Sequence, residues 1–485
     1  MPAADGRGKI CNGGVDHRVE FGELRVQSEV EREIMERESF GSRLGFILLS
    51  AGCAIGIGNV WKFPYLVGQN GGGAFVLIYL FFLVIMGVPV MTMEFAMGRG
   101  SKKSPVKMYQ QLEKPGSKWH IHGLICMVAN VILMMFYTTV AGWMLQYFVK
   151  TATGQFAGKD ADAVAAVFGD MLMQPGKMVI AMGITVVAGF FVCSIGLQQG
   201  LEKVTKVMMI CLLIIMVVLA VNSIFLKGAA EGLVFYLKPD LGRMKNAGFG
   251  NVVVAAMNQS FFTLSLGIGS MAIFGSYIDR EHSLMGEAVN VALLDTFVAI
   301  TSGLIIMPAC FAFGVEPGAG PGLIFITLPN IFNNMPLGRL WGSLFFIFMS
   351  FAAFSTVLAV FENIMACLMD LTGWDRKKTG LICAIGMFIL SLPCLLGFNV
   401  LSNIQPMGAG SGIMDLEDFI VSNLLLPGGS LLFVLFCTLR YGWGWDKFTA
   451  EADAGKGLKV AGWMRPYMTF VLPVIILVIL VIGLI

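Results

Sequence analysis

The chain has 485 residues, of which 56% are hydrophobic and 13% charged, and its mean hydropathy is +0.78. A water-soluble domain cannot bury this much apolar surface, so the composition excludes a soluble fold and indicates a protein whose solvent is largely lipid. The formal net charge of +2 gives no reason to expect a nucleic-acid partner.

Eleven apolar segments follow one another along the chain, and each approaches the roughly 20 residues that a membrane-spanning helix requires. The sequence lacks the alternation over about ten residues that is typical of membrane β-barrel strands. It therefore predicts an all-α polytopic membrane protein with eleven transmembrane helices. These helices are expected at residues 43–68, 74–97, 121–149, 178–195, 204–226, 248–277, 285–313, 340–369, 380–397, 419–440 and 466–485.

The first 40 residues are charged and contain no apolar run, so we expect no cleavable signal peptide. If the N-terminus is cytoplasmic, the Lys and Arg residues outside the spans favour the inner side by about three to one. The sequence therefore predicts a cytoplasmic N-terminus. No outer loop carries a pair of cysteines, and the single N-x-S sequence lies inside a span. Both observations favour a bacterial inner (plasma) membrane.

Two of the predicted spans are interrupted by glycines, in 56-GIG-58 and 267-GIG-269. Close helix packing is the usual reason for a glycine in a membrane helix. Two such motifs at corresponding positions of two five-helix units instead indicate the halves of a transporter, inverted because they start on opposite sides. The predicted parts are a cytoplasmic N-terminal segment (1–40), a first five-helix repeat (41–226), a second, inverted five-helix repeat (227–440), and a cytoplasmic loop with the eleventh helix (441–485).

Polar side chains inside the predicted spans are costly in lipid and mark candidate functional positions. The side-chain oxygens of Asn59, Thr263, Asp295, Ser355 and Thr356 form a set that suits a hard cation. For the last two residues, a hydrogen bond to the carbonyl four residues earlier is the alternative. The four histidines lie in or beside the N-terminal segment and the predicted inner loops, so we expect no transition-metal site.

Unwinding of the first and sixth helices at their glycines would leave backbone groups free at mid-membrane. Free N–H groups attract a carboxylate, and free carbonyl groups attract sodium or an ammonium group. One broken helix can therefore hold both ends of a zwitterionic amino acid. Tyr137 is a further candidate contact, although an aromatic residue in a span can also simply pack.

Several longer stretches resemble the neurotransmitter:sodium symporter family, specifically its bacterial amino-acid transporters. The resemblance implies sodium-coupled uptake by alternating access. It also implies a core of five plus five inverted helices in which helices 1 and 6 are broken. The stretches that carry it are 43-RLGFILLSAGCAIGIGNVWKFPYLVGQNGGGAF-75, 87-GVPVMTMEFAMGR-99, 136-FYTTVAGW-143, 259-QSFFTLSLGIG-269 and 415-DLEDF-419.

The resemblance further implies which residues form two sodium sites and the substrate site. One sodium site would comprise the carbonyls of Gly52, Ile55 and Ala352 and the hydroxyls of Ser355 and Thr356. The other would comprise the carbonyl of Ala54 with Asn59, Thr263 and Asp295. The substrate carboxylate would meet Ile57, Gly58 and Tyr137, and its ammonium group would meet Ala54, Phe262 and Thr263. The substrate side chain would lie among Leu133, Phe262, Ser265, Ile268 and Val360.

Charged residues at the two ends of the transport route would form gates. Lys62 and Asp418 match the outer pair, with lysine where the family usually has arginine, and Arg37 and Asp370 match the inner pair. Static pairing or snorkelling of the long side chains is the alternative. Because lysine lacks the bidentate fork of arginine, we expect the outer gate to close less firmly.

Three positions bear on ion and substrate selectivity. Asp295 stands where the family usually has asparagine. One helical turn later, Ala299 replaces the serine of chloride-dependent members and the glutamate of some chloride-independent ones. We therefore expect Asp295 to supply the compensating negative charge, which would make transport chloride-independent. Gly56 stands where monoamine transporters carry an aspartate, and this argues for an amino-acid substrate.

The sequence thus predicts a sodium-coupled symporter, with Na+ as cofactor, that imports a neutral, hydrophobic amino acid across a lipid bilayer. A sodium-conducting channel and a transport-inactive amino-acid sensor of the same fold are the alternatives. An intramembrane enzyme using Glu362 and Asp370 as acid and base is not expected, because no nucleophile–base pair or metal motif accompanies them. The particular amino acid and the oligomeric state are left open.

Overall fold

The computed structural model describes residues 38–315 and 322–484, and the predicted gate residue Arg37 therefore lies outside the described residues. Within them the chain is helical. The only β-type pairing in this part is an isolated bridge between His282 and Lys456. This confirms the prediction of an all-α protein.

Nine helices among the described residues are long and apolar enough to cross a membrane. Their bounds agree with nine of the predicted spans to within seven residues, and the largest differences are at the starts of Leu197–Ile224 and Ile413–Thr438. The agreement follows because an apolar run of this length is stable as a helix in lipid. These helices are Gly73–Ser101 (α4 Gly73–Phe82, η2 Leu83–Gly87 and α5 Val88–Ser101), His120–Ala152 (α7), Pro175–Ile195 (α9), Leu197–Ile224 (η3 Leu197–Glu202 and α10 Lys203–Ile224), Leu284–Ala312 (α15), Gly338–Thr372 (α17), Arg376–Leu396 (α18), Ile413–Thr438 (α19 Ile413–Phe419, η5 Ile420–Leu425 and α20 Leu426–Thr438) and Met464–Leu484 (α22 Met464–Pro466, η6 Tyr467–Val471 and α23 Leu472–Leu484).

The other two predicted spans, the first and the sixth, are broken. The first comprises Arg43–Ala54 (α2) and Gly58–Gln69 (η1 and α3), which are bent by 56° at the break. The sixth comprises Phe249–Thr263 (α13) and Ser270–Ser276 (α14) with an unwound stretch between them. The breaks occur at the glycine motifs, as predicted, whereas the total of eleven spans and the repeat boundaries stay predictions.

Six shorter helices were not predicted. Some of them begin with a local signal, such as the Asp160 side chain that accepts a hydrogen bond from Ala163 N at the start of α8. They lie in the connections between spans, where the sequence has no long apolar run that would predict a helix. They are Pro105–Leu112 (α6), Ala161–Leu172 (α8), Ala229–Leu237 (α11), Leu241–Ala247 (α12), Leu328–Asn334 (α16) and Trp445–Ala452 (α21).

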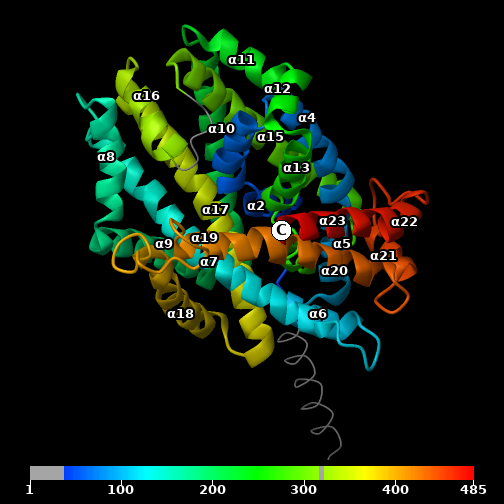
Figure 1. Cartoon of the computed structure of the whole chain (residues 1–485). Helices are drawn as coiled ribbons and strands as arrows, with labels where there is room; N and C mark the ends of the chain where they lie inside the picture. The colour runs from blue at the N-terminus through cyan, green and yellow to red at the C-terminus, as the bar shows by residue number, and fades with distance from the viewer. Residues whose placement is uncertain (1–37, 316–321, 485) are drawn as a thin grey trace, which may run out of the picture. The chain divides into compact units, whose positions relative to one another are not determined.

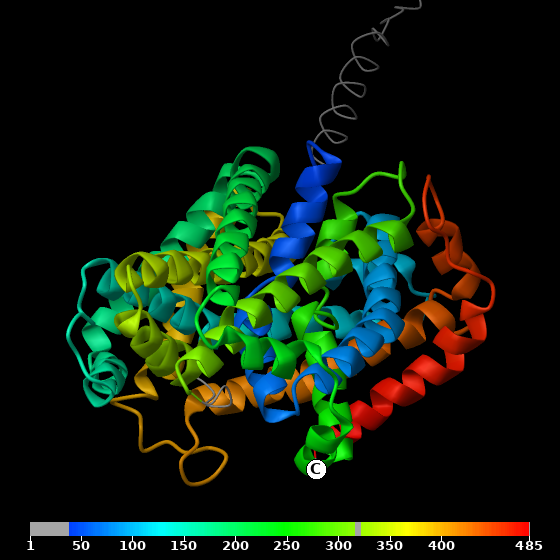
Figure 2. The same cartoon turned by 90° about the horizontal axis from the view of Figure 1, so that it is seen from above.

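The two longest helices, α7 and α17, pack against each other (Figure 1). Helix α17 also packs against α2 and α14, and α7 reaches the broken helices through hydrogen bonds of Tyr137 and Asn130. Peripheral helices instead expose aliphatic faces, such as Ile180 and Val187 of α9 and Ile385 of α18. Helix α23 lies beside α20 at an edge of the bundle (Figure 2). Only 22% of the most apolar stretch of Met464–Leu484 is buried. A buried centre and an apolar periphery are what a bundle in lipid requires.

Candidate substrate and ion site

The glycines at the break in helix 1 do not adopt left-handed backbone angles, since neither Gly56 nor Gly58 has a positive φ. At Gly56, a side chain would not fit between the backbone and its neighbours. A Cβ atom at Gly56 would lie 2.6 Å from Thr356 Oγ1 and closer still to Tyr137 Oη. The hydroxyl of Tyr137 is 3.0 Å from Ile57 N and accepts its hydrogen bond. Glycine is therefore needed here because α7 and α17 bring polar groups directly against the backbone.

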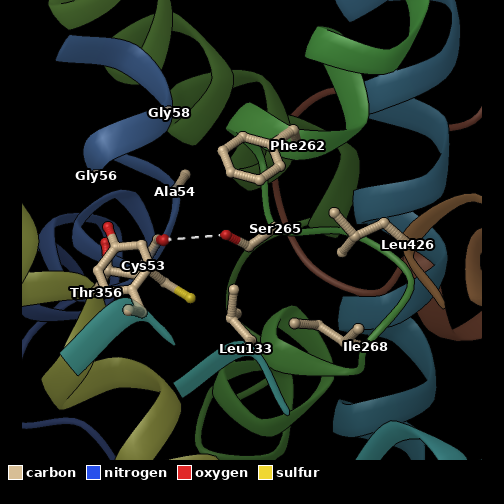
Figure 3. A pocket seen from close by; sticks show the side chains of 11 residues that line it. Cys53, Ala54, Gly56, Gly58, Leu133, Phe262, Ser265, Ile268, Thr356 and Leu426 are labelled. Carbon is tan, nitrogen blue, oxygen red and sulfur yellow. Dashed lines mark hydrogen bonds between the residues drawn. The ribbon is translucent and has the colours of Figure 1, made fainter. Parts of the chain in front are cut away.

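The break in helix 6 does rest on unusual backbone angles. Ser265, Gly267 and Gly269 all have positive φ, at 51°, 92° and 73°. A non-glycine residue in this region is strained. The hydroxyl of Ser265 donates to the carbonyl of Cys53 at 3.2 Å, which ties the two broken helices together (Figure 3).

Buried side chains satisfy the backbone groups that unwinding leaves free. Glu94, on α5, accepts hydrogen bonds from Gly267 N at 2.6 Å and Met271 N at 3.2 Å. Asn130, on α7, donates to Ile268 O at 2.7 Å. In the middle of a membrane such groups have no water to bond, so these side chains stabilise the breaks. Sequence reasoning missed both residues, although a buried glutamate in an apolar span was a signal that could have found the first.

A similar contact supports the first break, where Gln259 Nε2 donates to Gly58 O at 2.9 Å. Gln259 lies on α13, so the two broken helices stabilise each other's irregular backbone. The sequence did not reveal its role, since a single amide in a span does not indicate its partner. The site is therefore built by helices that cannot keep this shape separately.

One predicted sodium site is a compact cluster of five oxygens from α2 and α17. Ser355 Oγ lies 3.0 Å from Ala352 O and 3.4 Å from Ile55 O. Thr356 Oγ1 lies 3.3 Å from both Gly52 O and Ile55 O, and 3.4 Å from Ala352 O. A hard cation about 2.4 Å from each oxygen would leave neighbouring oxygens about 3.4 Å apart. The spacing and the all-oxygen chemistry therefore fit a sodium ion.

The alternative for the hydroxyls of Ser355 and Thr356 is a hydrogen bond to a carbonyl of their own helix. Both make such a contact, but it is not their only one. Each hydroxyl contacts the carbonyl of Ala352 and also reaches across to a carbonyl of helix 1. A hydroxyl engaged only in its own helix would not lie against free carbonyls of a neighbour. The cluster thus joins α17 to the broken end of α2.

The second predicted sodium site brings together Asn59, Thr263 and Asp295. The Asp295 carboxylate lies 2.7 Å from Asn59 Nδ2 and 3.0 Å from Thr263 Oγ1. All three residues are 0% exposed. Asn59 Oδ1 accepts from Gly56 N at 3.2 Å. Three segments distant in sequence thus place four side-chain oxygens together, a donor set that also suits a hard cation.

A small cavity lies between the two breaks. It leaves about 20 Å³ of space, enough for about one water molecule. An amino acid can therefore enter only when the surrounding side chains move apart. Figure 3 shows Phe262 on the side of Gly58 and Leu133 on the opposite side. The residues that line the cavity are Cys53, Ala54, Gly56, Gly58, Leu133, Tyr137, Phe262, Ser265, Ile268, Thr356 and Leu426.

Most of the predicted substrate residues are among these. Ile57 and Thr263 do not line the cavity. Ile57 N donates to the Tyr137 hydroxyl, and the Thr263 hydroxyl donates to Asp295. Val360 is fully buried in α17 but does not line the cavity. Leu426, at the start of α20, lines it without having been predicted, because a leucine in an apolar run gives no sign of a cavity. The roles of all these residues stay predictions.

The predicted outer gate is closed over Phe262. Lys62 Nζ lies 3.9 Å from Asp418 Oδ2 and 3.9 Å from the centre of the Phe262 ring. Ser422 Oγ lies 3.4 Å from Lys62 Nζ and donates to Asp418 Oδ1 at 2.8 Å. The ion pair is long and partly exposed, so it contributes about 0–1 kcal/mol. This is consistent with a lysine gate that holds loosely.

The opposite end of the route is closed by more, and shorter, contacts. Asp370 Oδ2 accepts from Ser104 N at 2.7 Å. Glu362 forms two 2.8 Å bonds with Arg376 and accepts from the Tyr277 hydroxyl at 2.7 Å. The Glu362 carboxylate therefore joins helices within a closed end, which is a structural role and not that of a catalytic acid.

The N-terminus of α2 is also tied down at this end. Glu202 accepts from Gly41 N and from the Ser42 hydroxyl, both at 2.9 Å. Arg43 bonds Glu287 at 2.7 Å and 3.0 Å. Movement of α2 away from the bundle would break all of these bonds. The structure thus has contacts at both ends of the predicted route at the same time, with the cavity between them.

Comparisons with known proteins give the family. Residues 37–164 and 161–485 match the sodium:neurotransmitter symporter family. An uncharacterized sodium-dependent transporter of Bacillus subtilis (strain 168) is 35% identical over 401 residues, which cover 83% of this chain and 87% of that protein. Another from Methanocaldococcus jannaschii is 31% identical over 462 residues, covering 91% of this chain and 89% of that protein.

The fold agrees with this match. The crystal structure of MhsT in complex with L-phenylalanine has a TM-score of 0.83 and 36% sequence identity, covering 92% of this chain and 100% of that one. The broken helices and the oxygen clusters lie inside the matched regions. The chain therefore belongs to the sodium:neurotransmitter symporter family, and it is a sodium-dependent membrane transporter rather than an enzyme.

Proposed function

We propose that the protein couples the inward movement of sodium to the uptake of a neutral, hydrophobic amino acid. The observation that carries the proposal is the cluster of five oxygens between α2 and α17, directly beside a cavity formed by two helix breaks. Thr356 belongs to the oxygen cluster and also lines the cavity, so sodium and substrate would bind on either side of the same residue. Occupation of one site would then favour occupation of the other.

The two ends of an amino acid find complementary groups around the cavity. The Tyr137 hydroxyl and the N–H groups at the start of η1 would receive the carboxylate, as anions are favoured at a helix N-terminus. The side chain would lie against Leu133, Ile268 and Leu426. MhsT, which is similar to this chain, was solved with L-phenylalanine. We therefore take L-phenylalanine as the first substrate to test.

Transport is proposed to be chloride-independent. Asp295 places a carboxylate against Asn59 and Thr263, where a second sodium ion would bind. Two sodium ions and a zwitterion bring two positive charges into a buried site, and this carboxylate neutralises one of them. Ala299, one turn along α15, has no group that could hold an anion.

The proposed setting is the inner membrane of a bacterium, with the N-terminus in the cytoplasm. Lys62 and Asp418 would then face the outside, and Asp370 the inside. Alternating access requires that the two ends open in turn, and the end around α2 has more and shorter bonds to break. Sodium that links α2 to α17 would keep this inner end closed until the ion leaves.

Equilibrium binding to the purified protein tests this function. Labelled L-phenylalanine is expected to bind in sodium buffer and not when choline replaces sodium. Unlabelled leucine, methionine and tryptophan are expected to compete, and aspartate and lysine are not, because the cavity wall offers no charged partner. Equal binding in the two buffers would refute sodium coupling, and competition by charged amino acids alone would refute the substrate class.

A further inference from the structure

A second buried polar cluster lies outside the ion and substrate site, between three helices. It consists of Glu417 on α19, Cys394 on α18 and Thr139 on α7, which are 5%, 0% and 1% exposed. The Cys394 thiol lies against both the Glu417 carboxyl group and the Thr139 hydroxyl. None of the residues predicted to bind sodium or substrate takes part.

Neither carboxyl oxygen of Glu417 accepts a hydrogen bond from an N–H or O–H group of the described residues. The thiol of Cys394, a weak donor, is the polar group that lies against the carboxyl group. Thr139 is unusual in the same way. Its neighbour Thr138 donates to Met134 O at 2.9 Å, as helical threonines commonly do, whereas the Thr139 hydroxyl bonds no nitrogen or oxygen of the described residues and lies against the Cys394 thiol.

A buried carboxylate without a donor or a cation is a costly arrangement. The group must therefore bind either a proton or a metal ion. The predicted sodium site that includes Thr356 provides five oxygen ligands for a cation. Around Glu417 there are only the two carboxyl oxygens, one hydroxyl and a thiol, which is too few hard ligands for sodium. A proton needs no such shell.

The charges around Glu417 leave it without compensation. From α18 the titratable group that faces it is the Cys394 thiol, and α7 brings the uncharged Thr139. The segment η5, Ile420–Leu425, contains no ionisable residue. On α19 itself, Asp415 is exposed and Asp418 is directed toward Lys62. No cation of the described residues therefore reaches the carboxyl group.

The cluster is mechanically linked to the outer gate. Glu417 and the gate residue Asp418 are adjacent on α19, so the helix that carries one must carry the other. In this closed arrangement Asp418 meets Lys62 and Ser422, while Glu417 is pressed between α7 and α18. If α19 moves when the gate opens, Glu417 gains contact with water.

We propose that Glu417 is a proton-binding site, and that closing the outer gate over the substrate takes up one proton there from the external solution. The carboxylate accepts the proton as α19 packs against α7 and α18, and it releases the proton outward when the gate reopens. This inference rests on the proposed function, because it concerns the closing of the gate over a bound amino acid. It makes occlusion of substrate dependent on external pH.

The test measures binding of labelled L-phenylalanine at saturating sodium from about pH 5 to about pH 7, below the range in which the ammonium group of the substrate loses its proton. In the unsubstituted protein the Kd is expected to rise with pH by up to tenfold per pH unit. Glu417→Gln mimics the protonated group, so its Kd is expected to stay near the low-pH value throughout. Asp415→Asn, on the exposed side of the same helix, is the control and should keep the pH dependence.

A second readout does not depend on a variant. Adding L-phenylalanine to the sodium-loaded protein in weakly buffered solution near the middle of this pH range should draw up to one proton per binding event. A pH-independent Kd, no proton uptake, or the same pH dependence in Glu417→Gln would overturn the inference and leave the transport function intact. Absence of sodium-dependent amino-acid binding at every pH would overturn both.

Discussion

Replacement of Asp295 by asparagine is the sharpest test of how the ions are held. The substitution keeps the shape of the side chain. The asparagine oxygen can accept from Asn59 Nδ2, now at 2.7 Å from the carboxylate, and the Thr263 hydroxyl can turn to accept from the new amide. The helices should therefore stay in place, and the negative charge is what is lost.

The magnitude follows from Coulomb's law. Two unit charges about 4 Å apart interact by about 4 kcal/mol at an effective dielectric constant of about 20. The amide oxygen still coordinates the ion through its dipole, so we expect a loss of about half that, or roughly a 30-fold rise in the sodium concentration for half-maximal binding. Because Asp295 is 0% exposed, solvent screens little of this effect.

The assay is sodium-dependent binding of L-phenylalanine in chloride-free buffer, with thermal unfolding in sodium-free buffer as a check that the fold is kept. The double variant Asp295→Asn with Ala299→Ser places a hydroxyl one turn along α15, and chloride should stimulate its binding. Unchanged sodium affinity in the single variant would refute the reasoning. So would a chloride requirement in the unsubstituted protein.

Two further predictions concern the helix breaks. Gly56→Ala should weaken L-phenylalanine binding strongly, because its Cβ strikes Thr356 Oγ1 and Tyr137 Oη, whereas Gly58→Ala meets the Phe262 ring at 2.8 Å, which can rotate away. Equal affinities in these two variants would contradict the packing argument. Glu94→Gln should destabilise the protein by about 1–3 kcal/mol, because one of two backbone N–H groups loses its acceptor. A thermal unfolding midpoint equal to that of the unsubstituted protein would contradict that role.

The sequence was sufficient to predict the nine long apolar helices and the positions of the two breaks. Long apolar runs determine where helices cross the bilayer, and glycine pairs interrupt them at residues 56–58 and 267–269. The physical reason for the first break was not predictable. Gly56 and Gly58 were expected to let the chain unwind, yet neither has a positive φ. The structure needs Gly56 for space, because Tyr137 and Thr356 from helices far away in sequence lie against it.

The residues that stabilise the breaks show the same limit. Glu94, Asn130 and Gln259 act on backbone groups of other helices, and their partners are set by packing alone. Leu426 reaches the cavity because α20 passes the unwound part of helix 6. A polar side chain inside a span indicates an important residue, but the sequence does not show which backbone group it bonds.

The central claim is that sodium drives the accumulation of a hydrophobic amino acid. Uptake of labelled L-phenylalanine into liposomes containing the purified protein tests it most directly. An inward sodium gradient should raise the internal concentration above the external one, and an ionophore that collapses the gradient should abolish the accumulation. Uptake that only equilibrates, sodium current without substrate, or binding without any uptake would contradict the account.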